Sequence, residues 1–515
     1  MQPSDFLTIL GLALAVWAII PSKERRFILL FFSKFEIGVF IASLFVIHYL
    51  MSFDWIITNW FPCLSIFTVK NGLPSSTWAY ILALTIIFFP IVKVSFGYFS
   101  TSRLKRMITL YKTYLKENEI DLLVNYINKY HITDIHKYLQ GISHLPQKEN
   151  IDIILRRRTE KDNASDKLVE PQRTLFASWV YGHIIQDETF IRKSANKYPE
   201  LFATAFSGME TKEASNQDLV KLFIECLFEN KNQLLIQELK IMNGTNSSVS
   251  EMNKEYDIPI LFSLFAHTKS ASANYVWYPV GEGGVKSLKH DTTQREFLIK
   301  KCDHDLESEL WNQKIYIAIV YFNYMVRETI YRDSECHMWL FYFRHFTDLL
   351  IEIIPSQNEY DEDSVYPSFA HKMIYEQFSI MKDWLDLAKE QETDNRVIDI
   401  IRCLGWCVHS ICQADDAKIS ISFRRRRLDL ILSTYFEFSY YPDNIGATTT
   451  RQWLERLFLN PKGVDFGVPE ITNEYLTALQ NAWDEFDKVP YEYHGNNNSI
   501  QHFITTVIKP LGLNG

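Results

Sequence analysis

Three apolar stretches decide the fold of this chain: FLTILGLALAVWAII at 6–20, IGVFIASLFVIHYLM at 37–51 and WAYILALTIIFFPIV at 78–92. Each run has about fifteen residues and no charged side chain, which is near the lower limit for a helix that crosses a bilayer. A buried core helix is the alternative for any single run, but three runs within the first hundred residues favour membrane spans. We predict spans at about 6–21, 37–57 and 77–95 in a transmembrane domain at 1–100.

A secretory signal peptide is the alternative interpretation of the first run. A signal peptide carries positive charge before its apolar segment, whereas residues 1–5 contain only one charged side chain, the acidic Asp5. We therefore expect a retained anchor. Trp55 and Trp60 follow the second run and suit a membrane–water interface, and Pro74 precedes a serine-rich start of the third span.

The distribution of basic residues predicts the orientation. The linker between the first two runs and the segment after the third run are basic, whereas the loop between the second and third runs holds only Lys70. Cytoplasmic loops carry the excess of lysine and arginine in membrane proteins. We expect a multi-pass protein of the inner (cytoplasmic) membrane, with its N-terminus outside and most of the chain in the cytoplasm.

Small residues at helical spacing within the runs predict close packing of helices in lipid. His48 lies inside the second run, where a titratable group either faces a polar lumen or bonds a neighbouring helix. Three spans cannot enclose a pore, so a channel would need several copies of the chain. The residues that we expect to pack or line such a pore are Gly11, Ala15, Gly38, Ala42 and His48.

The rest of the chain is acidic and reads as helical. The net charge is −9 overall, and residues 1–99 hold six basic and four acidic side chains, so the remainder carries −11. Such a charge excludes a general nucleic-acid binder. The seven cysteines show no paired spacing, which indicates reduced thiols. We expect no cofactor and no metal.

The fold class that follows is mainly α, with a large irregular helical cytoplasmic domain after the membrane spans. We divide it into a membrane-proximal helical segment at 101–150 and a sensor or interaction domain at 151–515, with 243–292 as a candidate internal boundary. Apolar periodicity predicts helices at 104–115, 121–129, 133–140, 173–185, 190–206, 217–227, 233–242, 306–331, 338–354, 372–389, 397–411, 428–438, 475–483 and 500–507. The glycine-containing stretch at 268–292 reads as a loop or a small hairpin.

Four consecutive arginines, Arg424, Arg425, Arg426 and Arg427, are the most unusual local feature. Guanidinium groups bind phosphates through paired hydrogen bonds, so this run is a candidate site for a nucleotide or short oligonucleotide. The alternative is a solvated face that pairs with acidic side chains. Arg156, Arg157 and Arg158 form a second, weaker candidate.

Two other motifs resemble catalytic sites without meeting their requirements. Gly281–Ser287 lacks the glycine that precedes lysine in a phosphate-binding loop. Cys302–Asp305 holds a His-Asp pair that could belong to a metal-dependent hydrolase, but an aspartate there is also a natural helix cap. We therefore expect no enzymatic activity, with hydrolysis near His304 as the remaining alternative.

In layout alone, with a few spans joined to a helical cytosolic mass, the chain resembles bacterial membrane effectors of anti-phage defence. The resemblance implies a homo-oligomer in the lipid bilayer whose cytosolic domain senses a nucleotide signal and perturbs the membrane. The leading hypothesis is therefore an oligomeric membrane effector or ligand-gated pore. The alternative is a membrane-tethered scaffold that recruits a protein partner.

Overall fold

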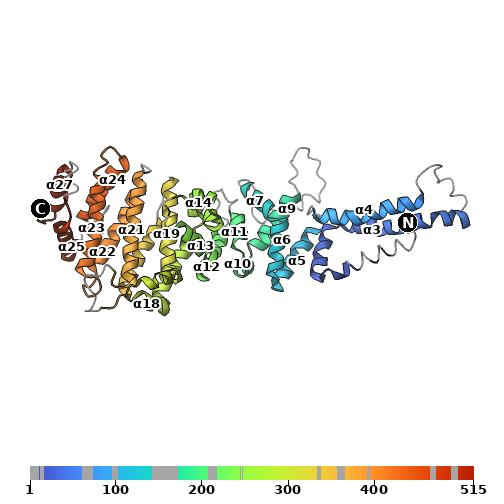
Figure 1. Ribbon diagram of the computed structural model, residues 1–515, viewed down its shortest axis with the longest axis horizontal. Helices are drawn as coiled ribbons and strands as arrows, with labels where there is room; N and C mark the ends of the chain where they lie inside the picture. The colour runs from blue at the N-terminus through green and yellow to red at the C-terminus, as the bar shows by residue number, and fades with distance from the viewer. Residues whose placement is uncertain are drawn as a thin grey trace. The chain divides into compact units, whose positions relative to one another are not determined.

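The computed structural model is built of helices, and its described residues contain no strand (Figure 1). Contacts divide the chain into two compact units, Met1–Phe190 and Ile191–Gly515, which we call unit 1 and unit 2. The structure describes residues 8, 11, 15, 17–60, 74–95, 103–141, 172–206, 217–243, 245, 247–332, 338–356, 366–390, 395–463, 471–488 and 497–514.

Unit 1 contains the apolar helices and the helices that follow them in the chain. Its elements are α2 (Ser22–Ile28), η1 (Leu29–Phe31), α3 (Lys34–Asn59), α4 (Ser75–Ser95), α5 (Leu104–Lys116), α6 (Ile120–Tyr130), α7 (Ile132–Gly141), α9 (Gln172–Val180) and η5 (Tyr181–Ile185). The short helix α10 (Glu188–Ser194) crosses the boundary between the units.

Helices α3 and α4 are long and apolar enough to cross a membrane, and they pack against each other. Ile47 of α3 lies in a narrow seam against Ala79 and Ala83 of α4, which are small enough to let the two backbones approach. The other described side chains of both helices are half-buried or exposed. An apolar surface of this extent is stable in lipid rather than in water.

The predicted count of three spans is not confirmed, because the described residues contain two candidate spans. Most of the first run, 6–21, lies outside the described residues, and only α3 and α4 qualify as spans among the residues that the structure describes. The second and third spans were predicted at 37–57 and 77–95 and begin slightly earlier, at Lys34 and Ser75. Ser33 starts α3 because its hydroxyl accepts the Glu36 N–H while the Glu36 carboxylate accepts the Ser33 N–H.

The segment that precedes α3 packs onto the helices that follow α4. Phe27 is 2% exposed and stacks on Tyr126 of α6 at a centroid distance of 3.7 Å. The Tyr114 hydroxyl of α5 donates to the Lys23 carbonyl at 2.9 Å, and Arg103 donates to the Phe32 carbonyl at 3.2 Å. Segment 22–33 and helices α5 and α6 therefore form one packed group.

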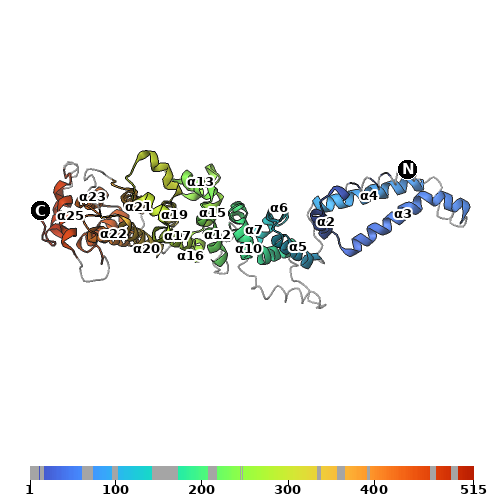
Figure 2. The ribbon, with the colours of Figure 1, turned by 90° about the horizontal axis from the view of Figure 1, so that it is seen from below.

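Unit 2 is a succession of helices in which each packs mainly on those close to it in the chain (Figures 1 and 2). Its elements are α11 (Pro199–Phe206), α12 (Gln217–Glu229), α13 (Gln233–Met242), α14 (Val249–Glu255), α15 (Pro259–Phe265), α16 (Thr268–Ala273), α17 (Tyr278–His290), α18 (Thr292–Leu298), η7 (His304–Asn312), α19 (Lys314–Tyr331), η8 (Met338–Leu340), α20 (Phe341–Ile353), α21 (Phe369–Glu390), α22 (Asn395–Gln413), α23 (Ile421–Phe438), α24 (Ile445–Leu459), α25 (Asn473–Glu485), α27 (Asn497–Phe503) and η9 (Ile504–Ile508).

Two predicted helices are divided in the structure. The predicted helix at 190–206 stops at Ser194 and restarts at Pro199, because proline lacks the N–H that a helix interior needs. The predicted helix at 306–331 becomes a 3₁₀ segment, η7, and then α19, with extended backbone at Gln313 between them.

The prediction of a loop or hairpin at 268–292 is wrong, because these residues form α16 and α17. The glycines of α17 serve close packing. A Cβ atom at Gly281 would lie 2.4 Å from the Tyr342 ring, and one at Gly283 would lie 2.4 Å from the Phe228 ring. Helices α12 and α20 therefore approach α17 more closely than any larger residue would allow.

Buried glutamate side chains accept hydrogen bonds at the starts of two short helices in unit 2. Glu238 of α13 accepts the Ile260 and Leu261 N–H groups at 3.1 and 2.8 Å, at the beginning of α15. Glu328 of α19 accepts the Val249 N–H at the beginning of α14. A helix start leaves its first N–H groups without partners, so a buried acceptor stabilises it. Burial raises the pKa of Glu238 to about 8.

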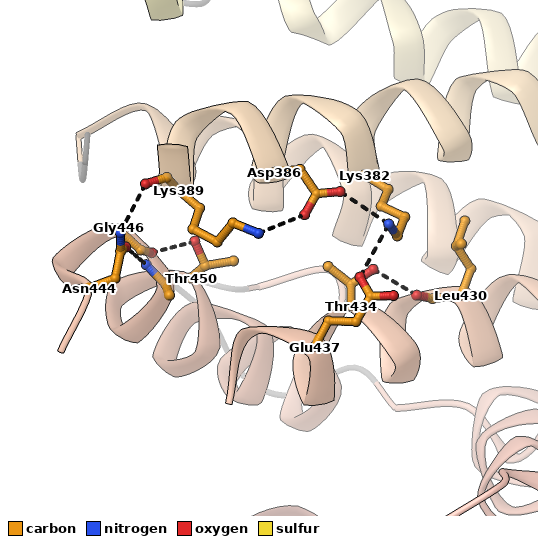
Figure 3. A network of polar contacts seen from close by, with 10 residues as sticks. Lys382, Asp386, Lys389, Leu430, Thr434, Glu437, Asn444, Gly446 and Thr450 are labelled. Atoms are coloured by element: carbon orange, nitrogen blue, oxygen red, sulfur yellow. Dashed lines mark hydrogen bonds and ion pairs between the residues drawn. The ribbon is translucent and has the colours of Figure 1, made fainter. Parts of the chain in front are cut away.

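Asn444 links two helices, α21 and α24 (Figure 3). Its side-chain nitrogen donates to the Lys389 carbonyl at 3.2 Å, and its oxygen accepts the Ala447 N–H at 2.7 Å, so it serves the end of α21 and the start of α24 together. Lys382 of α21 pairs with Glu437 of α23 at 3.3 Å. These contacts fix the order of helices in this part of unit 2.

Candidate functional site

The run of arginines begins one turn inside α23, which starts at Ile421 after the Ser420 cap rather than at the predicted residue 428. Arg424 is completely buried. Its Nε donates to the Ile411 carbonyl at 3.0 Å, its Nη2 donates to the Ala414 carbonyl, and its Nη1 lies 2.6 Å from Asp416. A cation at the end of α22 is favoured by the helix dipole, so Arg424 closes that helix.

Arg427 is buried on the same face of α23, one turn further along. Its guanidinium lies over the ring of Tyr375 at 4.1 Å and over that of Phe423 at 5.1 Å. Burial lowers the pKa of Arg427 to about 10, which still leaves the group charged at neutral pH. The aromatic faces therefore stabilise a cation that is shielded from water.

The other two arginines are half-exposed, and Arg425 pairs with Glu485 of α25. The run does not present four guanidinium groups to one ligand, since successive residues of a helix point about 100° apart. Asp416 pairs with Arg424, and Glu485 pairs with Arg425. Anion binding by the run stays a prediction, and the buried positions of Arg424 and Arg427 leave Arg425 and Arg426 as the residues that a ligand could reach.

The remaining predicted sites divide between described and undescribed residues. Arg156, Arg157 and Arg158 lie outside the described residues. In the Cys302–Asp305 motif, Asp303 caps η7 by accepting the Asp305 N–H at 3.1 Å, which agrees with the cap interpretation. Within the described ranges, no group of three or more His, Cys, Asp or Glu residues could hold a metal ion.

The residues expected to pack or line a pore are exposed on the apolar helices. Gly38 and Ala42 lie on the surface of α3, and a Cβ atom at Gly38 or at Gly11 would meet no atom within 4 Å. Ala15 is exposed as well. His48 lines an open hollow of about 700 Å³ together with Phe45, Tyr49, Ser52, Trp55, Ile56 and Trp60.

A cluster of exposed aromatic residues in unit 2 was not predicted as a site. We call it the aromatic patch, and it comprises Tyr275, Trp277, Tyr278 and Phe341. Tyr275, Tyr278 and Phe341 are 46%, 37% and 42% exposed. Their ring centroids lie 5.6, 6.0 and 6.1 Å from that of the half-buried Trp277.

The aromatic patch is positioned by the connection between α16 and α17 and by the start of α20. Pro279 stands in the first turn of α17, where its fixed φ angle suits a helix start. Tyr342, the neighbour of Phe341, is buried against Gly281 and donates from its hydroxyl to Glu282 at 2.8 Å. The aromatic residues before Pro279 were the sequence signal for this patch. They were overlooked because the nearby glycines led us to predict a loop.

No protein-family model matches this chain, and neither a curated protein nor a solved structure is similar to it.

Proposed function

We propose that this protein is a membrane-anchored helical scaffold that recruits another protein through unit 2. The aromatic patch is the observation that carries this proposal. Exposed tyrosine, tryptophan and phenylalanine side chains gathered on one surface are typical of protein interfaces, where they supply most of the binding energy. Helices α3 and α4 supply the membrane anchor.

The proposed arrangement in the membrane rests on the contacts of segment 22–33. This segment precedes α3, and it packs on α5 and α6, which follow α4. If α3 and α4 cross the bilayer as a hairpin, the segment and both helices lie on one side. The basic residues Lys23, Arg26, Lys105 and Arg106 belong to this group, which supports the cytoplasmic side.

An oligomeric membrane effector or ligand-gated pore is the second candidate, because α3 leaves a polar residue exposed. His48 is exposed within the uncharged stretch 37–51 of α3, and lipid is an unfavourable surrounding for an imidazole. In an oligomer, Gly38 and Ala42 would let neighbouring copies of α3 approach, and His48 would face the lumen. A nucleotide signal, as in anti-phage defence, would act through Arg425 and Arg426.

Purification of the full chain from membranes, after chemical crosslinking, separates the two candidates. For a scaffold we expect a defined protein to co-purify in constant ratio, with at least a tenfold loss in the Tyr278→Ala/Phe341→Ala double variant. The matched control is Tyr441→Ala/Ile445→Ala, which removes exposed side chains elsewhere in unit 2. The control should retain the partner.

Vesicles that contain the purified protein alone provide the opposite test. A scaffold releases no trapped dye and conducts no ions, whereas a pore does both. Ion flux that disappears in His48→Ala would establish the effector and overturn the scaffold. Equal recovery of partner by the patch variant and its control would also overturn it.

A further inference from the structure

Resting on the proposed scaffold function, we propose that the aromatic patch binds an extended, proline-containing segment of the partner protein, with an acidic residue beside the proline. The segment would lie across Tyr275, Trp277 and Tyr278. Three independent features of the patch support this assignment: the backbone of Tyr275, the polar groups at the edges of the rings, and the charge of Lys221.

The backbone of Tyr275 adopts a conformation that disfavours tyrosine. Its φ angle is +50°, in the left-handed region, where it ends α16. The Tyr275 N–H donates to the Ser272 carbonyl at 3.1 Å, and the Val276 N–H donates to the Ala271 carbonyl at 3.3 Å. Glycine is the residue that usually occupies this position, because it has no Cβ atom to clash.

The side chain of Tyr275 makes few contacts that could stabilise the fold. The side chain is 46% exposed, and its one ring contact among the described residues is with Trp277. A residue held in an unfavourable conformation, with its side chain directed to solvent, indicates a role in binding. The ring of Tyr275 extends the aromatic surface beyond the helices themselves.

The polar groups of the patch donate to no acceptor within the described residues, so a partner could accept their hydrogen bonds. Within the described residues, the Tyr275 and Tyr278 hydroxyls and the Trp277 indole N–H have no hydrogen-bond partner. A polyproline II segment has no internal hydrogen bonds, so its carbonyl groups are free to accept. Proline rings pack flat on aromatic faces, and aromatic surfaces with donors at their edges recognise such segments.

Lys221 determines the charge that suits this surface. Its Nζ lies 4.4 Å from the Tyr278 ring centroid, and no carboxylate of the described part of the chain pairs with it. Unit 2 belongs to an acidic part of the chain, so an unpaired lysine beside exposed aromatic rings favours an acidic group on the partner. Lys221 would repel a basic group on the partner.

The test uses the full chain in lipid nanodiscs and a displayed library of random twelve-residue peptides. We expect enrichment of peptides that contain proline next to aspartate or glutamate. A synthetic peptide with the enriched sequence is then titrated against wild type and variants. Tyr275→Gly should weaken binding at least about tenfold and leave the Tm unchanged or higher by about 1 to 3 °C.

Lys231→Gly is the matched control, since Lys231 also has a positive φ angle, +48°, at the end of α12. We expect it to raise the Tm in the same way without any change in peptide affinity. Lys221→Glu should reverse the preference from acidic to basic peptides. Trp277→Phe retains the apolar ring and removes the indole N–H, so it should weaken binding by a smaller factor than Tyr275→Gly.

Two outcomes would overturn the inference. One is enrichment of basic or proline-free peptides, and the other is equal affinity of wild type and Tyr275→Gly for the selected peptide. If no peptide is enriched while the natural partner still co-purifies in a patch-dependent way, the scaffold stands and the extended-segment inference fails. If co-purification also ignores the patch, both fail.

Discussion

Phe27 and Tyr126 stack face to face, with their ring planes 3° apart and their centroids separated by 3.7 Å. The two residues are almost a hundred positions apart in the sequence, and α3 and α4 lie between them. The contact therefore joins the segment before α3 to a helix that follows α4, at one end of the apolar helix pair. It also brings together the basic segments on which the proposed orientation rests.

Loss of the Phe27 ring should loosen this end of unit 1. For Phe27→Ala we expect α6 to lose about 3 kcal/mol of protection, because the change removes a buried aromatic side chain and leaves a cavity. Hydrogen–deuterium exchange of residues 120–130 in detergent measures the loss. Phe35→Ala is the control, since Phe35 is 79% exposed. Unchanged exchange in Phe27→Ala would contradict the packed arrangement.

Arg424 should matter for stability rather than for ligand binding. Arg424→Ala leaves the carbonyls of Ile411 and Ala414 without their donor, so we expect the free energy of unfolding of unit 2 to fall by about 2 to 4 kcal/mol. The half-exposed Arg426, changed to alanine, should cost less than about 0.5 kcal/mol. Urea unfolding of both variants makes the comparison. If Arg424→Ala keeps full stability but loses affinity for a nucleotide, the anion-site hypothesis is correct.

Glu238 should make unit 2 less stable at alkaline pH. Burial raises the pKa of its carboxyl group to about 8 in the folded chain, compared with 4.5 for an unperturbed glutamate. The folded state thus holds a proton that the unfolded state releases between these values. Stability from this group is complete below pH 4.5 and is lost as the pH rises through 8, with a slope of at most ~1.4 kcal/mol per pH unit.

Urea unfolding at pH 5.5 and at pH 8.5 checks this sign. The free energy of unfolding should be lower at pH 8.5, and Glu238→Gln should reduce the difference because an amide does not titrate. The variant will be less stable in general, since only its oxygen can accept a backbone N–H. Identical pH dependence in wild type and Glu238→Gln would show that the carboxyl group does not hold the proton.

Gly283 should tolerate no side chain while Phe228 faces it. Gly283→Ala places a methyl group where the ring now lies, so we expect a loss of about 1 to 3 kcal/mol despite the better helix propensity of alanine. Phe228→Val removes the ring atoms that would clash. The loss in free energy of unfolding of the double variant should be smaller than the sum of the two single losses by at least about 1 kcal/mol. A loss equal to that sum would mean that the close approach is absent.

Local signals explain how much of the fold could be predicted. The helix at Gln233–Met242 was predicted with its exact bounds because its apolar residues repeat at helical spacing. In the structure, Asn232 caps its start. The apolar runs of α3 and α4 were equally clear. The prediction failed at α17, where three glycines favour a loop locally and tertiary packing against aromatic rings favours a helix.

The candidate sites show the same division between local and long-range causes. The sequence predicted that Arg424–Arg427 would be unusual, but their surroundings depend on how α22 and α25 pack on α23. The aromatic patch was present in the sequence as Tyr275, Trp277 and Tyr278, yet Phe341 joins it only in the folded chain.

By itself, the sequence determined that this protein is mainly helical, that apolar runs near its start suit a membrane, and that the large remainder is acidic. It predicted three spans, and the structure describes two helices of that kind. Composition and helical periodicity are properties of neighbouring residues, so they can be read without a fold. Only the tertiary structure decided which arginines are buried, which glycines admit a ring and which aromatic residues remain exposed. Those outcomes depend on which helix faces meet, and that is set by contacts between residues far apart in the chain.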